Sequence, residues 1–138
     1  MLFQVMKRSI LLLDHNPIFL HSAAYLLRQE GYRTHTASSG RTAFDLMGNQ
    51  SFDVIVTELI LSGEANGIDV LVQHNRVSPQ SAKVLLTGAR SSEIVKVCQY
   101  IGALYIPKPV AFDDLLHLIE KASIRRHLLP SRPSEILN

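Results

Sequence analysis

Short, continuous runs of apolar residues alternate along this chain with longer segments in which apolar residues recur every three or four positions. Together with one more mixed segment at 32–36, the runs at 10–13, 54–56, 84–86 and 104–106 predict strands buried in a sheet. The periodic segments predict helices at 17–30, from about 40, from about 67, from about 93 and at 112–126. Because parallel strands need helical crossovers, this alternation predicts an α/β fold: a doubly wound, five-stranded parallel sheet flanked by five helices.

The residues between these segments are of the kinds that begin and end helices. Asn16 is suited to cap a helix, and Pro17 suits the first helical position, where a missing N–H costs nothing. Gly31 can end the same helix in the left-handed conformation. The Ser91-Ser92-Glu93 stretch predicts a second helix start.

Four predicted strands are followed by residues that could carry chemistry. Asp14 ends the first strand, Glu58 the third and Thr87 the fourth, and Lys108 follows the fifth. In a doubly wound sheet the functional crevice lies at the carboxyl ends of the strands. Single polar residues are common at strand ends, but two acids, a hydroxyl and an ammonium at one edge favour a functional site.

Composition and charge narrow the class of protein. The chain has 138 residues, of which 46% are hydrophobic and 19% charged, as expected for one globular domain. Residues 1–123 carry 11 basic and 11 acidic residues, so the net charge of +2 comes from the last fifteen. A neutral body predicts no direct nucleic-acid binding. Since the N-terminal apolar runs are short and interrupted by charge, and Cys98 is the single cysteine, we expect a cytoplasmic protein without membrane contact.

Four stretches of the chain resemble the receiver domain of response regulators, the CheY-like module of two-component signalling. They are LLLDHNP, DVIVTEL, LLTGA and YIPKPVAFDDLL. The resemblance runs from about residue 9 to 122 and implies the strand order 2-1-3-4-5. It divides the chain into an N-terminal extension at 1–8, a receiver domain at 9–123, and a basic helix end and tail at 124–138. It also implies a signalling module rather than an enzyme.

The resemblance assigns roles to individual residues. Glu58 stands at the phosphoacceptor position, Thr87 and Lys108 at the phosphoryl-contacting positions and Tyr105 at that of the switch aromatic. The bond between Lys108 and Pro109 is implied to be cis.

The same resemblance implies a metal site. Its Mg²⁺ ligands would be Asp14, Glu58 and the backbone carbonyl of Ile60. His15 replaces the second acid of the family's pair, and because Mg²⁺ prefers oxygen ligands we expect weakened binding. A transition metal at His15 and Asp14 is the alternative, and a histidine that only faces solvent is the simpler interpretation.

Glu58 is the second departure from the family, which has Asp at this position. One added methylene moves the nucleophilic oxygen by about 1 Å, which can cost about a hundredfold in rate. We therefore interpret the chain as an atypical receiver that signals by protein–protein contact and is not phosphorylated in the ordinary way. The alternatives are a phosphorylatable regulator, a constitutively active-like one in which Glu58 mimics the phosphoryl group, and a vestigial site. A small α/β enzyme is less favoured, because no phosphate-binding glycine loop is present.

The partner surface is expected on the fourth helix, fifth strand and fifth helix. A histidine kinase, an output protein or a second copy of the chain could dock there. Cys98 is interpreted as a buried small apolar residue. The remaining histidines show no ligand spacing and are expected on the surface: His21, His35, His74, His117 and His127.

Overall fold

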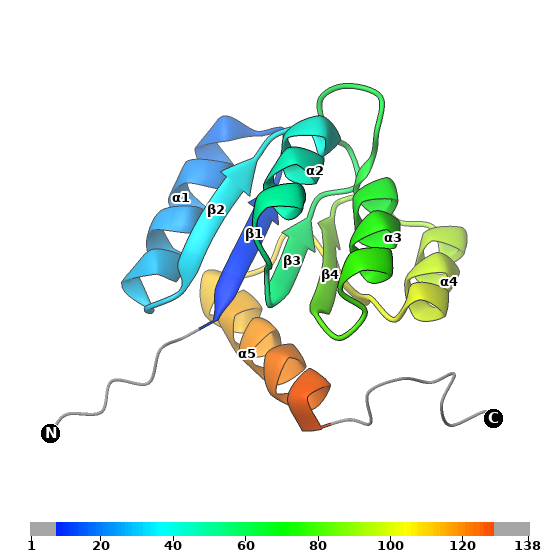
Figure 1. The fold of residues 1–138 in the computed structure, drawn as a ribbon. Coiled ribbons are helices and arrows are strands. Elements are labelled where there is room, and N and C mark those ends of the chain that lie inside the picture. Colours follow the sequence, from blue (N-terminus) through cyan, green and yellow to red (C-terminus); the bar gives the residue numbers. More distant parts are fainter. Residues whose placement is uncertain (1–7, 129–138) are drawn as a thin grey trace, which may run out of the picture.

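The computed structural model describes residues 8–128, and within them strands and helices alternate as predicted (Figure 1). The elements in chain order are β1 (Ser9–Leu13), α1 (Pro17–Gln29), β2 (Arg33–Ala37), α2 (Gly40–Asn49), β3 (Val54–Thr57), α3 (Gly67–Val77), β4 (Ala82–Thr87), α4 (Ser92–Ile101), β5 (Leu104–Pro107) and α5 (Phe112–Leu128). All neighbouring strands are parallel, in the order β2-β1-β3-β4-β5. The predicted fold class and strand order are confirmed.

The predicted helix boundaries are set by the expected capping residues. The Asn16 side chain accepts hydrogen bonds from the backbone N–H groups of Ile18 and Phe19, and Pro17 is the first residue of α1. Gly31, just beyond the end of α1, has a φ of 96°, which a side chain would disfavour. Ser91 caps α4 by accepting from the N–H of Glu93.

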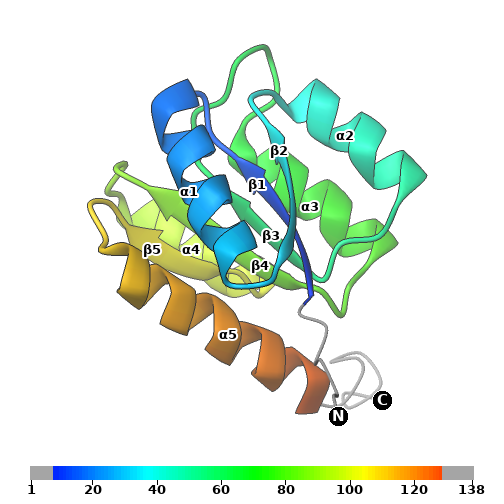
Figure 2. The same ribbon diagram turned by 90° about the vertical axis from the view of Figure 1, so that its left-hand side faces the viewer.

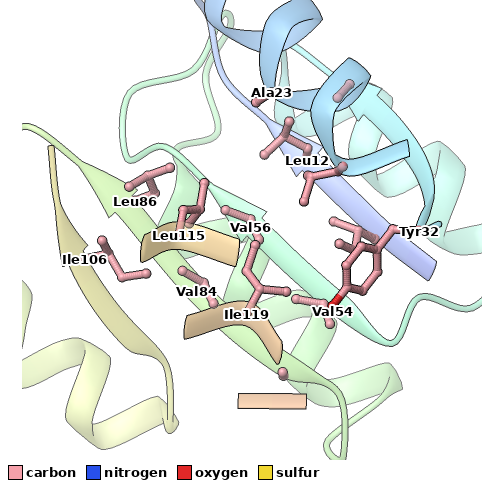
Figure 3. Close-up of a cluster of buried hydrophobic side chains, with 14 of the residues drawn as sticks. Leu12, Ala23, Tyr32, Val54, Val56, Val84, Leu86, Ile106, Leu115 and Ile119 are labelled. Carbon is pink, nitrogen blue, oxygen red and sulfur yellow. The ribbon is translucent and has the colours of Figure 1, made fainter. Parts of the chain in front are cut away.

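Two layers of helices cover the sheet. Helices α1 and α5 lie on one face and α2, α3 and α4 on the other (Figures 1 and 2). Alternate residues of each strand serve the two cores: Leu12 and Val56 pack toward α1 and α5, whereas Leu11 and Ile55 pack toward α2–α4. Figure 3 shows Leu115 and Ile119 of α5 over the strands of the first core. Strands β1, β3 and β4 are buried along their whole length, which explains their continuous apolar runs.

The register of the sheet brings the predicted site residues together. Leu13 is paired with Thr57, so the next residues, Asp14 and Glu58, leave β1 and β3 side by side. The ladder continues past the strand ends, since the N–H of Glu58 donates to the carbonyl of Leu13. On the other side, Thr87 is paired with Pro107, which places Lys108 next to Thr87 at the same edge.

One histidine is not where the sequence pattern places it. His74 was expected on the surface, but it is buried, 2% exposed, on the inner face of α3. It follows Gly67, Val70 and Leu71 at helical spacing on that face, so the polar side chain occupies an apolar position. His21 and His117 are exposed as predicted.

His35 is less exposed than predicted, whereas the burial of Cys98 is confirmed. His35 is only half-buried, with its ring edge-on to Phe52 at a centroid distance of 5.6 Å. Cys98 is buried, as predicted. The side chain of His127, residues 1–7 of the predicted extension and the tail after Leu128 lie outside the described residues. No helix in the described part of the chain is long and apolar enough to cross a membrane.

Candidate functional site

The four polar residues at or just after the strand ends meet at the carboxyl edge of the sheet. The Lys108 ammonium lies 2.6 Å from Asp14 Oδ2 and 3.1 Å from Glu58 Oε1. On the other side of Glu58, the Thr87 hydroxyl donates to Oε2. The expected convergence of these groups is therefore observed.

Glu58 is held by donors on both of its carboxyl oxygens. Besides Thr87, Oε2 accepts from the N–H of Leu59 at 2.6 Å and lies 3.4 Å from the nitrogen of Ile60. Burial by itself raises the pKa of Glu58, but the hydrogen bonds from Thr87, Lys108 and Leu59 outweigh it. The pKa is therefore lowered from its ordinary 4.5. The side chain is a buried carboxylate anion at neutral pH.

Gly67 fixes the backbone that carries this carboxylate. The first residue of α3 approaches β3 so closely that a Cβ at position 67 would lie 2.1 Å from the Glu58 carbonyl oxygen. The N–H of Gly67 donates to the carbonyl of Leu59 at 2.7 Å. Only glycine permits this approach, and it ties the turn after β3 to the start of α3.

Lys108 is the cation of the site. Its ammonium also lies 4.4 Å from the centroid of the Phe19 ring, on the first helix. Burial lowers the pKa of Lys108, but its hydrogen bonds to Asp14 and Glu58 have the larger combined effect, so the pKa is raised above 10.5. The bond between Lys108 and Pro109 is cis, as the sequence resemblance implies.

A hydrogen-bonded path runs from Glu58 to Tyr105. The Thr87 hydroxyl that donates to Glu58 accepts from the N–H of Ala89 at 3.1 Å. The carbonyl of Ala89 in turn accepts from the Tyr105 hydroxyl at 2.8 Å. The half-buried ring of Tyr105 on β5 is thereby linked to the buried carboxylate through the Thr87 hydroxyl and the backbone of Ala89.

Three contacts at this edge were not predicted from the sequence. Phe19 packs against the Lys108 ammonium, the N–H of Asn16 donates to Asp14 Oδ1 at 2.9 Å, and Arg90 donates to the Lys108 carbonyl at 3.1 Å. Only Asn16 was singled out by its sequence position, as a helix cap. No local pattern marks the other two residues.

Comparison with known proteins decides the family. The family model described as the response regulator receiver domain matches residues 10–120 of this chain. The chain belongs to the response regulator receiver family. It is therefore the receiver domain of a two-component response regulator, a signalling module.

Curated relatives of this receiver include longer regulatory proteins. It is 36% identical over 107 residues to the alginate biosynthesis transcriptional regulatory protein AlgB of Pseudomonas aeruginosa, covering 77% of this chain and 24% of that protein. The transcriptional regulatory protein ZraR of Escherichia coli K12 is 33% identical over 103 residues, which cover 74% and 23%. The receiver thus spans about a quarter of the length of these relatives.

Solved structures show the same fold. A CheY-like receiver domain protein from Methanospirillum hungatei superposes with a TM-score of 0.82 at 26% identity, covering 87% of this chain and 96% of that one. A receiver domain protein from Clostridium thermocellum gives 0.79 at 30% identity, with coverages of 88% and 98%.

The residues of this receiver do not fit the metal site that the family implies. Asp14 Oδ2 contacts the Lys108 ammonium, and Oδ1 accepts from the N–H of Asn16. The Ile60 carbonyl, the expected third ligand, lies 3.0 Å from His15 Nδ1. Among residues 8–128, no group of three or more His, Cys, Asp and Glu side chains is placed to hold a metal ion. His15 Nδ1 lies 3.8 Å from Asp14 Oδ1, so the transition-metal alternative at these two residues stays a prediction.

Proposed function

We propose that this receiver signals without phosphorylation, with the buried Glu58 carboxylate standing where a phosphoryl group would be bound. The observation that carries the proposal is the pair of contacts at Glu58: Thr87 donates to one oxygen and Lys108 to the other. These are the two residues that the resemblance assigns to the phosphoryl oxygens. A charge that is always present holds them in one arrangement, so a kinase is not needed to create it.

The contacts of Tyr105 support a fixed state rather than a vestigial site. A site that had lost its role would not need to keep the path from Glu58 through Thr87 and Ala89 to the Tyr105 hydroxyl. One carboxylate offers fewer oxygens and less charge than a phosphoryl dianion, so the bias that it supplies is smaller. The retained hydroxyl, ammonium and aromatic contacts favour the active-like interpretation.

We propose that the signal is read as protein–protein contact on the surface formed by α4, β5 and α5. Val97, Tyr100 and Leu104 are exposed apolar residues on α4 and β5, and Tyr100 is 92% exposed. Leu104 precedes Tyr105 on β5, and Val97 and Tyr100 lie on α4, which packs against that strand. An output protein or segment in the cytoplasm is the proposed partner, with a histidine kinase or a second receiver as the alternatives. Neither nucleic acid nor a membrane is proposed as a direct partner.

Ordinary phosphorylation is disfavoured by the geometry of Glu58. An attacking oxygen needs a lone pair directed at the incoming phosphorus, but Oε2 already accepts from Thr87 and Leu59, and Oε1 faces Lys108. The added methylene also displaces the carboxyl group relative to Asp. Both effects slow transfer to this side chain.

The experiment that tests the proposal is intact-protein mass spectrometry after incubation with acetyl phosphate and Mg²⁺. We expect no added phosphoryl group on the wild type, whereas the His15→Asp/Glu58→Asp double variant, which has both family acids, gains one. Glu93→Asp shortens an exposed glutamate of α4 by the same methylene and serves as the matched control. Labelling of the wild type at Glu58 would refute the proposal.

A further inference from the structure

We propose that this receiver supplies its own cation: Lys108, assisted by His15, replaces the divalent metal, and the site is complete without Mg²⁺. The inference does not depend on what Glu58 signals, because it concerns only how the charge of the two acids is balanced. The site in question is the family's metal site, in which His15 replaces the second acid.

The Lys108 ammonium lies between the carboxylates of Asp14 and Glu58. Asp14 and Glu58 are 1% and 6% exposed, so bulk water solvates neither carboxylate well, and their charge has to be balanced by groups of the protein. Lys108 Nζ contacts one oxygen of each, at 2.6 and 3.1 Å. A cation bridging two carboxylates is the arrangement that a metal ion otherwise provides.

The carboxylate oxygens that do not contact Lys108 accept hydrogen bonds from uncharged groups. Asp14 Oδ1 accepts from the N–H of Asn16, and Glu58 Oε2 accepts from Thr87 and the N–H of Leu59. Each carboxylate therefore has one oxygen on the ammonium and the other on uncharged donors of the chain. The two acids and one lysine leave a net charge of −1, which these dipoles stabilise.

The backbone carbonyl of Ile60 is occupied by a hydrogen bond to His15. A carbonyl can only accept, so His15 carries the proton on Nδ1 and donates it to Ile60 O across 3.0 Å. This contact joins the loop after β1 to the loop after β3. The imidazole thereby uses the backbone oxygen that the family resemblance assigns to the metal.

These contacts make Mg²⁺ binding unfavourable. The ion would have to displace Lys108 from both acids and break the hydrogen bond from His15 before it could reach the two carboxylates and the Ile60 carbonyl. Mg²⁺ loses water reluctantly and requires near-octahedral oxygen ligands. Asp at position 15 would remove the hydrogen bond to Ile60 and raise the negative charge by one, so this position sets how strongly a divalent ion competes with Lys108 for the two acids.

The test is a titration of the wild-type receiver and the His15→Asp variant with Mg²⁺ by calorimetry, and with Mn²⁺ by line broadening in ¹H–¹⁵N spectra. His15→Asp should bind Mg²⁺ roughly tenfold more tightly or better, with Mn²⁺ broadening the amide signals of Asp14 and Ile60. The wild type should show neither effect. His21→Asp, which adds a carboxylate at an exposed position of α1, is the matched control and should behave like the wild type.

Two results would overturn the inference. One is broadening of the Asp14 and Ile60 signals of the wild type by Mn²⁺, accompanied by Mg²⁺ binding as tight as that of His15→Asp. The other is a folded His15→Asp variant that binds no more Mg²⁺ than the wild type, because position 15 would then not control the site. Both results are read from metal binding, whereas the proposed function fails when a phosphoryl group is found on Glu58 of the wild type, so the two failures are distinguishable.

Discussion

Replacing Lys108 with methionine is expected to destabilise the receiver by about 3–5 kcal/mol at neutral pH. The substitution keeps a similar apolar stem but removes the ammonium that contacts both Asp14 and Glu58. Two nearly inaccessible carboxylates are then left without a cation, and removing one partner of a buried pair costs more than the pair itself contributes. Urea unfolding of the two proteins at the same pH gives the difference.

The matched control is Lys96→Met, because Lys96 is an exposed lysine of α4, and it should change stability by less than about 0.5 kcal/mol. Adding Asp14→Asn to Lys108→Met should recover part of the lost stability, because it removes one of the two buried negative charges that Lys108→Met leaves without a cation. A Lys108→Met protein as stable as Lys96→Met would contradict the bridging role of the ammonium.

The pH range of this effect follows from the two shifted groups. The pKa of Glu58 is lowered, so its contribution is complete above pH 4.5 and is lost as the pH falls through the folded-state value. The pKa of Lys108 is raised, so its contribution is complete below pH 10.5 and is lost as the pH rises through its folded-state value. Between these limits the difference between wild type and Lys108→Met should be nearly constant.

His74→Leu is expected to stabilise the receiver, and increasingly so in acid. Neither ring nitrogen of His74 has a hydrogen-bond partner, and burial, with a smaller effect of the Lys83 charge, lowers the pKa of His74 from 6.5 to about 4. The unfolded chain therefore takes up a proton below pH 6.5 that the folded protein accepts only near pH 4. At about 1.4 kcal/mol per pKa unit, the wild type loses on the order of 3 kcal/mol across this window.

The measurement is the unfolding free energy of wild type and His74→Leu at about pH 7, 5.5 and 4, which spans the range from the ordinary histidine pKa of 6.5 to the lowered value of about 4. At pH 7 the leucine variant should already be more stable by about 1 kcal/mol, since a buried polar group without a partner is removed. His117→Leu alters an exposed histidine of α5 and should follow the wild type at every pH. Equal acid sensitivity of His74→Leu and wild type would show that His74 titrates normally.

The fold was predictable because its signals are local. Apolar runs mark β1, β3 and β4, which are buried on both faces, and Asn16 and Ser91 cap the helices that they precede. The convergence of Asp14 and Lys108 was also predictable, although they lie 94 positions apart, since residues that follow parallel strands share one edge.

The details of the site depend on contacts between distant residues, which leave no periodic pattern in the sequence. Whether His15 faces solvent or Ile60 is decided by how two loops meet, and the residues are 45 positions apart. The packing of Phe19 against Lys108 likewise joins a helix to a strand end far along the chain. His74 was misplaced for a related reason: residue type predicted exposure, but its position on the inner face of α3 decided its burial.

In the proposed function, the Glu58 carboxylate alone maintains the arrangement of Thr87, Ala89 and Tyr105. The most direct measurement compares ¹H–¹⁵N spectra of the wild type and Glu58→Gln, each with and without beryllofluoride and Mg²⁺. Glutamine keeps the shape but removes the charge that Lys108 contacts. We expect beryllofluoride to leave the wild-type spectrum unchanged, and we expect Glu58→Gln to shift the signals of Thr87, Ala89 and Tyr105. A wild type that shifts at these residues with beryllofluoride, or a Glu58→Gln spectrum unchanged there, would contradict the proposed function.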